Sequence, residues 1–532
     1  MKTSRTSQDM SVISSVNPAT LEMVGEVKAT QLDDVEEIVR KAREAFPAWR
    51  DLGPKRRAEI LMNAQQILLR RCEEFGRLIT QEMGRPFVEA VVMEVEACVD
   101  LMGYYAKYAQ RFLSNHRVPL HNMLLKRRKS RDHVQPLGVV GVISPWNWPL
   151  FIPMGSIAPA LVAGNAVVFK PSELTPLAGE KIRALFLDAG VPETVFQIVQ
   201  GGPSVGGALV DSDVEKIFFT GSTDVGRLIM KQAAPKLKKC VLELGGNDPA
   251  IICDDADLEN ASSGIVWGAF SNCGQNCNAV ERVYVDASVA EDFIRLVVEK
   301  AKTLRVGDGM EYGTDVGPLV SEAQLQKMEG IVKRAVGAGA KILTGGKRLH
   351  EMKGYFFEPT AIFWDRTLCP ADEEIFGPIV TITPVKDDEE AIRLANRSTF
   401  GLAASVWTEN LGRGHQIAER IESGSVMVND VIVSFGIPEA ERTGMKNSGV
   451  GWANGKKGLD EMVSIQYIHA NSQCHIQNFW WFPYKESVVR TMKAGLDFLY
   501  TREQWKRMRA LPRVIKGFAG HLLLNRRRND KL

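Results

Sequence analysis

Residues 139–173 have the sequence VVGVISPWNWPLFIPMGSIAPALVAGNAVVFKPSE, and this stretch decides the fold class of the chain. Two short apolar runs, Val139–Ile143 and Ala166–Phe169, flank a helical stretch that is punctuated by glycine and proline. Two further runs of the same kind follow at Phe196–Val199 and Lys216–Phe219. Short strands that alternate with helices predict βαβ units, and therefore an α/β protein with a parallel sheet.

A second region with the same alternation of short apolar runs and helical stretches begins near Gly245 and ends near residue 445. Its clearest predicted strands are Ala250–Ile252, Val283–Val285 and Ile379–Thr383. At 532 residues the chain is too long for one hydrophobic core, so two or three domains are expected.

The segments before the first sheet are predicted to be helical. Apolar residues recur at helical spacing over Asp33–Trp49 and again over Arg56–Ile79. Basic residues crowd Lys126–Arg131, which would make a poor core segment. We therefore expect an exposed strand or loop there.

Composition narrows the function classes. The net charge of +2 gives no reason to expect a nucleic-acid partner. The eight cysteines form no CxxC pair and accompany no histidine cluster, so neither a disulfide framework nor a metal site is predicted. Such sparse cysteine favours a reducing compartment, which we expect to be the cytoplasm. The first ten residues are polar, unlike a secretion signal, and no uncharged run is long enough to span a bilayer.

The segment Phe270–Ala279, FSNCGQNCNA, contains a candidate nucleophile, Cys277. A cysteine in a polar turn with glycine can be approached closely by a substrate. The thiolate is the reactive form, so this residue needs a nearby proton acceptor or dipole. Taken alone, a single cysteine in an α/β protein is more often buried and inert, and that alternative stays open here.

Two further segments carry candidate catalytic groups. Glu243 lies between two leucines and ahead of two glycines, and desolvation of its carboxyl would raise the pKa towards neutrality, as suits a general base. Its alternative is a strand-end carboxylate paired with a lysine. Asn147 lies in Pro145-Trp-Asn-Trp-Pro149, where a rigid amide N–H suits an oxyanion hole, or where the turn only packs on the core.

Segments after two predicted strands are candidates for cofactor binding. Lys170 and Glu173 follow one strand, at the edge of a parallel sheet where ligands bind, and they could hydrogen-bond ribose hydroxyls. Thr220-Gly-Ser-Thr-Asp-Val-Gly226 opens a helix after the next strand, which favours a pyrophosphate. Its glycine spacing is GxxxxG and not GxGxxG, so the pattern is only suggestive. The segment Glu373–Pro378 by itself predicts a turn.

Together these segments resemble the aldehyde dehydrogenase superfamily, and the resemblance covers residues 12–468. The Leu-Glu243-Leu-Gly-Gly and Gly-Gln-Asn-Cys277 segments match the two signatures of that family and lie 34 positions apart. The Trp-Asn147, Lys-Pro-Ser-Glu173, Thr-Gly-Ser-Thr and Glu-Ile-Phe-Gly-Pro segments also occur in the family's order. The activity that this implies is NAD(P)-dependent oxidation of an aldehyde to a carboxylic acid.

The resemblance implies roles for the catalytic residues. Cys277 would form a thiohemiacetal, and Asn147 with the backbone N–H of Cys277 would hold its oxyanion. Hydride transfer to the nicotinamide would leave a thioester, which water activated by Glu243 would hydrolyse. A CoA-acylating enzyme is the close alternative, and Glu243 argues against it because such an enzyme needs no activated water. A binding protein that merely keeps the fold is a second alternative, although neither Cys277 nor Glu243 is lost.

The resemblance also implies a cofactor set. Lys170 and Glu173 would contact the adenosine ribose, and Ser222 with the turn Gly221–Gly226 would contact the pyrophosphate. The Glu173 carboxylate suits free ribose hydroxyls and repels a 2′-phosphate, whereas Lys170 attracts one. NAD is therefore favoured and NADP stays open. The remaining residues of the set are Trp146, Leu244, Glu374 for the nicotinamide ribose and Phe376 for the ring.

Three departures from the family pattern concern the substrate side and the tail. Ser156 stands where many members have a lysine thought to relay protons. The polar segment Pro438–Gly444 replaces the usual Pro-Phe-Gly-Gly near the substrate funnel, so the substrate cannot be carried over from relatives. The third is a C-terminal extension beyond the common family length. The residues expected to line an apolar tunnel, which would favour hydrophobic aldehydes, are Trp148, Phe151 and Phe270.

The resemblance implies a Rossmann-like cofactor domain (12–117 and 134–244), an α/β catalytic domain (245–445) and a small β oligomerisation arm (118–133 and 446–469). Such arms complete a neighbour's sheet, so a homodimer or homotetramer is expected. Residues 470–532 form the amphipathic, basic C-terminal extension.

The extension combines aromatic and basic residues. Phe479–Tyr484 is an aromatic cluster, and the apolar residues Val488, Val489, Met492, Leu496 and Leu499 fall on one face of a helix. From Lys485 to the end there are 13 Lys and Arg against four Asp and Glu, a net charge of +9. Such a tail suits peripheral contact with an anionic membrane surface. The alternative is that it packs on its own subunit or a dimer partner.

Overall fold

The structure is a computed structural model, and it describes residues 12–122, 125–126, 128–364, 373–472, 477–478 and 480–529. The chain divides into two compact units. The larger unit contains residues 1–114 and 134–464, and the smaller one contains residues 115–133 and 465–532.

The first sheet of the larger unit has six strands in the order β19-β9-β8-β5-β6-β7. Strands β5 to β9 run parallel to their neighbours, whereas β19 is antiparallel to β9. The four predicted strands of this region are confirmed, and the sheet supports the predicted parallel α/β architecture. The bounds are β5 Val139–Ile143, β6 Ala166–Lys170, β7 Phe196–Ile198, β8 Lys216–Thr220, β9 Lys239–Glu243 and β19 Gly449–Val450.

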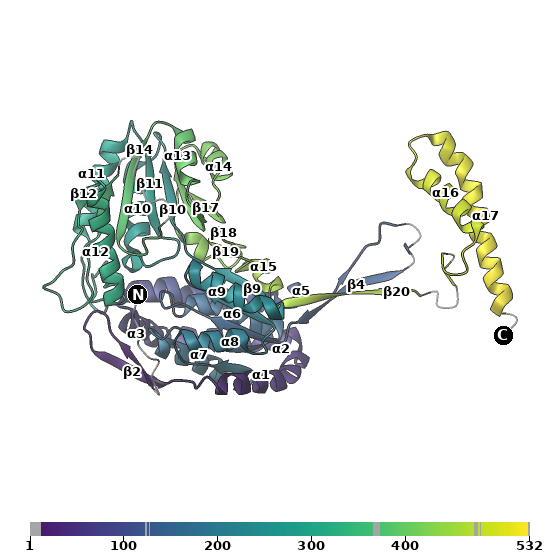
Figure 1. The fold of residues 1–532 in the computed structure, drawn as a ribbon, viewed down its shortest axis with the longest axis horizontal. Helices are drawn as coiled ribbons and strands as arrows, with labels where there is room; N and C mark the ends of the chain where they lie inside the picture. The colour runs from purple at the N-terminus through teal and green to yellow at the C-terminus, as the bar shows by residue number, and fades with distance from the viewer. Residues whose placement is uncertain are drawn as a thin grey trace. The chain divides into compact units, whose positions relative to one another are not determined.

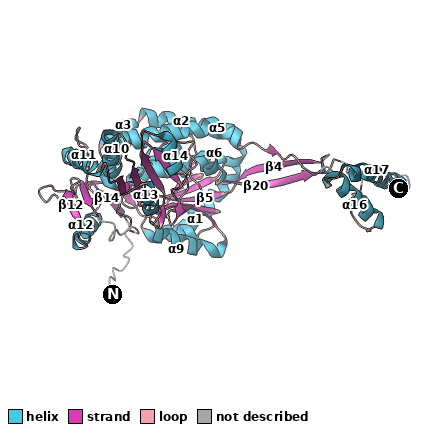
Figure 2. Ribbon diagram, turned by 90° about the horizontal axis from the view of Figure 1, so that it is seen from above, coloured by secondary structure: helices cyan, strands magenta, loops and turns pink. Residues whose placement is uncertain are grey.

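Helices cover both faces of this sheet (Figure 2). The predicted helical segment Arg56–Ile79 is two helices, α2 and α3, because the chain leaves helical geometry at Arg71. The bounds are α1 Asp34–Asp51, α2 Gly53–Arg70, α3 Cys72–Met83, α4 Phe87–Glu89, a π-helical turn Ala90–Val95, α5 Glu96–Phe112, α6 Phe151–Ala163, α7 Pro176–Ala189, α8 Pro203–Asp211 and α9 Thr223–Ala233.

The second sheet has seven strands in the order β12-β13-β14-β11-β10-β16-β17, mostly parallel. Figure 1 shows α11 and α12 on one side of it and α13 and α14 on the other. The strands are β10 Asp248–Ile252, β11 Val280–Asp286, β12 Lys341–Thr344, β13 Thr360–Phe363, β14 Ile379–Val385, β16 Ala403–Trp407 and β17 Ser425–Val428. The helices are α10 Leu258–Phe270, α11 Ala290–Thr303, α12 Glu322–Gly337, α13 Asp388–Ala395 and α14 Leu411–Ala418.

The segment 446–462, which the sequence analysis assigned to the arm, lies differently. Its strand β19 pairs with β9 in the first sheet, and helix α15 (Gly455–Asp460) packs on α6 of the cofactor region. Only the end of the predicted range, strand β20, belongs with the arm. The physical reason is that the chain returns from the second sheet to complete the edge of the first. Two small two-stranded sheets remain, formed by β1 Val12–Val16 with β2 Met23–Lys28 and by β15 Phe400–Gly401 with β18 Met445–Lys446.

The smaller unit contains most of a three-stranded sheet in the order β20-β4-β3 and a pair of helices that pack on each other. Lys129 and Arg131, which belong to the predicted basic segment, lie in β4 and are exposed. The bounds are β3 His116–Arg117, β4 Lys129–Pro136, β20 Val463–Ala470, α16 Glu486–Tyr500 and α17 Gln504–Asn529. Among the helices of the described residues, none is long and apolar enough to cross a membrane.

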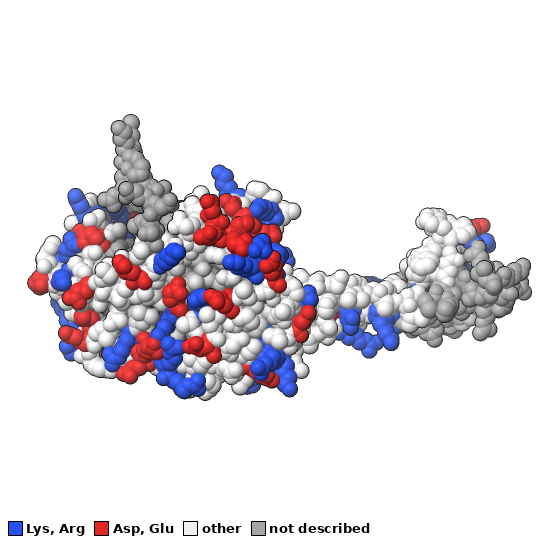
Figure 3. All heavy atoms as spheres, turned by 90° about the horizontal axis from the view of Figure 1, so that it is seen from below, with Lys and Arg blue, Asp and Glu red and all other residues white. Residues whose placement is uncertain are grey.

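Charged side chains of both signs alternate over the face of the larger unit shown in Figure 3. No extended patch of a single sign covers that face, in keeping with the small net charge of the whole chain.

Candidate active site

A pocket of about 220 Å³ lies between the first sheet and the second region of the larger unit. It is lined by Pro145, Trp146, Asn147, Ile152, Thr220, Gly221, Ser222, Leu244, Gly245, Cys277, Gln324, Lys327, Glu374 and Phe376. Eight residues predicted from the sequence meet there, although they come from five separate segments of the chain. Four predicted residues are not among the lining residues, namely Lys170, Glu173, Gly226 and Glu243.

Cys277 lies in the turn before β11 and borders the pocket. The chain enters this turn through residues 272–274, whose φ angles of 50°, 56° and 66° are all left-handed. Gly246 lies opposite, where an added Cβ would be 2.1 Å from the carbonyl oxygen of Cys277. Burial raises the pKa of the Cys277 thiol to about 12, and the positive charge of Arg442 opposes this. Because the thiol is protonated at neutral pH, nucleophilic attack needs a proton acceptor.

The side-chain amide of Asn147 is fixed at the edge of the pocket. Its Nδ2 donates one hydrogen to the carbonyl oxygen of Gln275 at 3.0 Å, and an amide nitrogen has a second hydrogen to offer. The main-chain oxygen of Asn147 accepts from Nη2 of Arg85 at 2.8 Å and from Nδ2 of Asn272 at 3.2 Å. The predicted rigidity of this residue therefore comes from hydrogen bonds as well as from its proline and tryptophan neighbours. A fixed N–H donor of this kind suits an oxyanion.

A buried ion pair behind Asn147 was missed by the sequence analysis. Arg85 is fully buried, and its Nη1 donates to Oε1 of Glu94 at 2.6 Å. The other oxygen of Glu94 accepts the backbone N–H groups of Leu150 and Phe151 at the start of α6, at 2.8 and 3.0 Å. This network anchors the loop after β5. Nothing in the sequence marks it, because Arg85 and Glu94 lie more than 50 positions from the loop that they hold and meet it only in the fold.

Glu243 is the last residue of β9, and its side chain is buried. Oε1 has no hydrogen-bond partner, and no lysine of the described residues pairs with the carboxyl. Burial raises the pKa of Glu243 and the positive charge of Arg442 lowers it, while the charge of Glu243 raises the pKa of Cys277. The two groups are therefore electrostatic neighbours. A buried carboxyl oxygen without a partner costs stability, which fits a group kept for proton transfer.

The start of helix α9 faces the pocket. Gly221 and Ser222 line it, and the Ser222 hydroxyl caps the helix by accepting a backbone N–H of the first turn at 3.4 Å. Gly226 has a different task, because an added Cβ would lie 2.5 Å from the side chain of Leu244. Its missing side chain lets Leu244 pack against α9. The free N–H groups at this helix start favour an anion.

Lys170 and Glu173 lie at and just after the carboxyl end of β6, outside the pocket lining. Lys170 is buried, and its Nζ donates to the carbonyl oxygen of Pro171 at 2.9 Å. The same nitrogen lies 3.6 Å from Oε2 of Glu173, and burial lowers the pKa of Lys170. Because β6 is the neighbour of β5, this pair extends the same sheet edge on which the pocket lies.

Glu374 and Phe376 close the pocket from the second region. Oε1 of Glu374 accepts the backbone N–H of Gly246 at 3.1 Å. The Phe376 ring meets the Trp146 ring edge-on, with centroids 5.6 Å apart. Phe376 has a φ of 56°, a strained conformation for a residue with a side chain. The strain implies that neighbouring groups hold the backbone in place.

The holding group is Glu281 on β11, another residue that the sequence analysis missed. Its carboxylate accepts the backbone N–H groups of Ile375 and Phe376 at 2.8 to 3.0 Å, and Nδ2 of Asn247 at 2.8 Å. Burial, with the charge of Glu374 second, raises the pKa of Glu281 to about 7. No local motif distinguishes this glutamate from any other strand residue.

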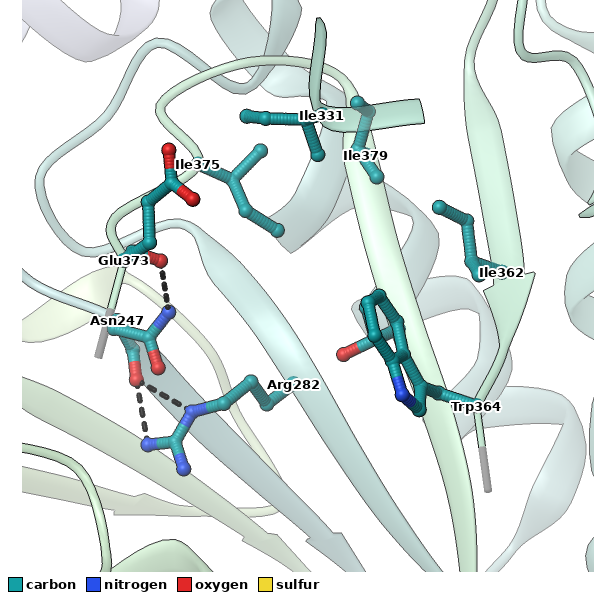
Figure 4. Close-up of a pocket in the computed structure, with 9 residues that line it drawn as sticks. Asn247, Arg282, Ile331, Ile362, Trp364, Glu373, Ile375 and Ile379 are labelled. Atoms are coloured by element: carbon teal, nitrogen blue, oxygen red, sulfur yellow. Dashed lines mark hydrogen bonds between the residues drawn. The ribbon is translucent and has the colours of Figure 1, made fainter. Parts of the chain in front are cut away.

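A second, small cavity of about 30 Å³ lies behind the same segment (Figure 4). Asn247 lies on one side of it, where its Nδ2 donates to the carbonyl oxygen of Glu373 at 3.1 Å. The carbonyl oxygen of Asn247 accepts Nε and Nη2 of Arg282 at 3.0 and 2.7 Å. The opposite wall is apolar and includes Ile331, Ile362, Trp364, Ile375 and Ile379. The space is about that of one water molecule. The hydrogen bonds of Asn247 connect the segment that carries Glu374 to Arg282 on β11.

The aromatic residues predicted to line a substrate tunnel lie elsewhere. Trp148, Phe151 and Phe270 are each only 1% exposed and are absent from the lining of the pocket at Cys277. Trp148 and Phe151 instead pack against Phe435, with ring centroids 4.9 and 4.5 Å apart. They form an apolar layer behind the site, and Ile152 is the residue of this segment that reaches the pocket.

No group of three or more His, Cys, Asp or Glu in the described part of the chain could hold a metal ion. The fold and the pocket define an α/β oxidoreductase that uses a dinucleotide cofactor. The family follows from the sequence: the model of the aldehyde dehydrogenase family matches residues 5–468, and the chain belongs to this family.

Relatives agree with this assignment. The mitochondrial succinate-semialdehyde dehydrogenase of Arabidopsis thaliana is 40% identical over 465 residues, 87% of each chain. The structure of an aldehyde dehydrogenase from Bacillus cereus in complex with NAD⁺ superimposes with a TM-score of 0.83 at 35% identity, covering 87% of this chain and 94% of that one. An NADP-dependent enzyme of E. coli superimposes with a TM-score of 0.82 at 34% identity, covering 86% and 95%.

The chain is therefore an oxidoreductase that oxidises aldehydes to carboxylic acids with NAD(P). The residues of the pocket fit such a cofactor. The start of α9, with N–H groups that suit an anion, and the carboxylate of Glu374 both line the pocket. Gly245 leaves room beside that carboxylate, because an added Cβ would lie 2.7 Å from its Oε2.

Proposed function

We propose that Cys277, Asn147 and Glu243 carry out the oxidation. The sulfur of Cys277, after loss of its proton to a water molecule, adds to the carbonyl carbon of the aldehyde. The new oxyanion accepts hydrogen bonds from Nδ2 of Asn147 and from the backbone N–H of Cys277. The observation that carries this proposal is the buried, unpartnered oxygen of Glu243 in electrostatic contact with Cys277.

The second half of the reaction follows from the same groups. When bound, the nicotinamide ring accepts the hydride that leaves the former aldehyde carbon, and a thioester remains on Cys277. Glu243 then takes a proton from a water molecule, whose oxygen adds to the thioester carbon. The carbon–sulfur bond breaks, the carboxylic acid leaves, and the thiol is restored.

The cofactor roles are proposed from the same pocket. Gly221 and Ser222 at the start of α9 would contact the pyrophosphate. Glu374 would hold the nicotinamide ribose, with Phe376 against the ring. The remaining members of the proposed set are Lys170 and Glu173 at the adenosine ribose, Trp146 and Leu244 on the pocket wall, and Gly226 as the residue that lets Leu244 approach α9. We propose a preference for NAD, because the half-exposed carboxylate of Glu173 would repel a 2′-phosphate.

The name of the plant relative suggests a substrate class. Succinate semialdehyde bears a carboxylate at the end opposite its aldehyde. We propose that this chain also oxidises an aldehyde with a distal carboxylate, in place of the hydrophobic aldehyde favoured by the sequence. The buried positions of Trp148 and Phe151 support this change, because they remove the predicted apolar tunnel wall.

The experiment is to mix the purified full chain with NAD⁺ and succinate semialdehyde, and to measure NADH and free acid. We expect the two products in equal amounts without coenzyme A. Acid formation that depended strictly on added coenzyme A would overturn the proposal in favour of an acylating enzyme. Failure to form NADH from any aldehyde in a panel of varied length and charge would overturn the catalytic assignment.

We propose that the chain forms a homodimer or homotetramer through the arm of β3, β4 and β20. A small sheet with open edges can be completed by a neighbour's strands. Light scattering after size-exclusion chromatography should give a mass of two or four chains. A monomer at micromolar concentration would contradict this.

We propose that the C-terminal helices rest on an anionic membrane surface. Small residues form the interface between α16 and α17: Thr491, Ala494 and Ala510 are buried, and an added Cβ on Gly517 would lie 2.1 Å from Oγ1 of Thr491. Large apolar side chains are left exposed, among them Trp481, Phe482, Tyr484, Trp505, Met508 and Ile515. Exposed aromatic residues beside a net charge of +9 suit headgroups and the outer acyl region.

Sedimentation with vesicles tests this proposal. We expect the full chain to pellet with vesicles of phosphatidylcholine and phosphatidylserine, less so at high salt, and a chain that ends at residue 475 to stay in solution. Equal sedimentation of both chains would overturn the proposal. Loss of the oligomer on truncation, with no vesicle binding by the full chain, would assign these helices to a subunit contact.

We propose a cytoplasmic location, because the chain has few cysteines. Two plant relatives are named as mitochondrial enzymes, so the proposal does not come from them.

A further inference from the structure

Arg442 is a cation in the electrostatic neighbourhood of Cys277 and Glu243 that the proposed reaction does not use, and it is not among the residues that line the pocket. Its backbone pairs with that of Ala453 through two hydrogen bonds of 2.9 and 2.8 Å. Its guanidinium carbon lies 4.7 Å from the centroid of the Phe435 ring, which packs in turn on Trp148 and Phe151. The head group of Arg442 therefore rests on a rigid aromatic layer.

Apart from the Phe435 ring, the guanidinium group has no hydrogen-bond or ion-pair partner among the described residues. Its Nε is buried without a hydrogen-bond acceptor, and among the described residues no carboxylate forms an ion pair with it. The adjacent acid, Glu441, is engaged instead with Lys457 at 3.2 Å. A buried N–H without an acceptor is unfavourable, so the position of Arg442 implies an acceptor that arrives from outside the chain.

The positive charge of Arg442 affects the pKa of both reactive groups, Cys277 and Glu243. It lowers the pKa of Cys277 and of Glu243, and for each residue it is the strongest influence that opposes burial. The peptide that contains Arg442 is tied to the same region, because Ser448 a few residues later accepts the backbone N–H of Leu244 at 2.9 Å. A molecule attached to Cys277 would therefore extend into the field of this cation.

We propose that Arg442 binds the carboxylate at the far end of the aldehyde substrate and so determines specificity for ω-carboxy aldehydes. This inference rests on the proposed role of Cys277, which holds the other end of the same molecule. A planar guanidinium matches the two oxygens of a carboxylate, and its stacking on Phe435 orients it in advance. The polar segment Pro438–Gly444 thus supplies a cation suited to such a substrate.

The test compares two substrates of the same length, succinate semialdehyde and its terminal amide, in the full chain and in Arg442→Met. We expect the ratio of kcat/KM between carboxylate and amide to fall about 100-fold in the variant, mainly through KM. Arg442→Lys should recover part of the ratio, because it keeps the charge and loses the planar fork. Lys457→Met, which removes a neighbouring exposed cation, should leave the ratio unchanged.

Binding without turnover gives a second readout. Succinate should raise the thermal unfolding midpoint of the wild-type chain and not that of Arg442→Met. An equal fall of kcat/KM for both substrates would overturn the inference and would assign Arg442 to the ionisation of Cys277 and Glu243. A wild-type ratio near one would also overturn it while leaving the proposed function intact. Oxidation of neither substrate would refute the proposed function itself.

Discussion

Cys273 and Cys277 lie four positions apart in one turn, yet they face different regions of the molecule. Cys273 belongs to the hydrophobic core of the second region, where burial and the negative charge of Glu89 both raise its pKa. Cys277 borders the pocket and feels the positive charge of Arg442. Burial raises the pKa of both thiols, so their neighbours and their access to the pocket distinguish them.

Two buried glutamates show the same contrast. The carboxylate of Glu281 accepts hydrogen bonds from two backbone N–H groups and from Asn247, and it holds the strained backbone at Phe376. Glu243 has an oxygen without any partner. A buried polar group that is fully paired stabilises a conformation, whereas one left unpaired beside a pocket remains available for proton transfer. The reactive carboxyl group of this site is therefore the one whose hydrogen bonds are incomplete.

The largest expected effect separates the two cysteines. Cys277→Ala should lower kcat by at least about 10³-fold, because no other group can form the thioester. Cys273→Ala should keep kcat within a few-fold and lower the free energy of unfolding by about 1 kcal/mol, through the lost packing of one sulfur. Steady-state NADH formation and thermal unfolding measure the two. Equal loss of activity in both variants, with both still folded, would show that the two cysteines do not differ in their roles.

The next effect concerns Glu243. In Glu243→Gln, turnover should fall about 10²- to 10⁴-fold, while mixing with NAD⁺ and aldehyde still gives a first burst of NADH. The reason is that the thioester forms but lacks its base for hydrolysis. The acyl adduct should then be visible on Cys277 by intact mass spectrometry. Loss of the burst along with turnover would mean that Glu243 is needed to deprotonate the thiol first.

The pH dependence of hydrolysis tests the same role of Glu243 as a general base. A general base works only when deprotonated, and burial raises the pKa of Glu243 above its ordinary 4.5. The hydrolysis rate should therefore fall as pH drops through that raised pKa, and this acid limb should vanish in Glu243→Gln. Single-turnover decay of the acyl adduct from about pH 5 to 9 measures it. An unchanged acid limb in the variant would assign the limb to another group.

Asn147 should show a smaller loss. In Asn147→Ala, kcat should fall about 10²- to 10³-fold with little change in the dissociation constant of NAD⁺, because the hydrogen of Nδ2 that is not donated to Gln275 serves the oxyanion. Pre-steady-state NADH formation should slow in the same proportion. A normal burst rate would show that the amide of Asn147 acts only as a support for the main chain around Gln275.

Local chemistry explains which features could be predicted from the sequence. Strands such as Val139–Ile143 are continuous apolar runs bounded by glycine and proline, and a parallel sheet buried on both faces requires that pattern. The pocket residues after these strands share one sheet edge, so their meeting follows from topology. The segment 446–462 was assigned to the arm because nothing local shows that β19 returns to pair with β9.

The supporting residues could not be predicted in this way. Arg85 reaches Asn147, and Glu94 reaches the start of α6, only after the segment that follows α3 has packed against the loop after β5. In the sequence, Arg442 is one residue of the polar segment that departs from the family pattern. Its position near Glu243 depends on the pairing of β19 with β9, which are about 200 positions apart. Trp148 and Phe151 were assigned to a tunnel because an aromatic residue has the same pattern whether it lines a pocket or lies behind one.

The smallest effect tests the paired carboxylate against the unpaired one. Glu281→Gln should weaken NAD⁺ binding about 10-fold, because a neutral amide supports the backbone N–H groups of Ile375 and Phe376 less well than a carboxylate does. Fluorescence titration with NAD⁺ measures this. The matched control is Glu82→Gln, since Glu82 is also a buried carboxyl that accepts two backbone N–H groups, at Leu177 and Ala178.

Both variants should lower the free energy of unfolding by about 1–3 kcal/mol, because each leaves a buried polar group poorly satisfied. Only Glu281→Gln should change the dissociation constant of NAD⁺, since its hydrogen bonds end on the segment that carries Glu374 and Phe376. If both variants weakened NAD⁺ binding equally, the effect would come from general loss of stability. If Glu281→Gln left binding unchanged, the strained conformation at Phe376 would be held by packing around Asn247 and Ile375, and the paired carboxylate would have no part in the cofactor site.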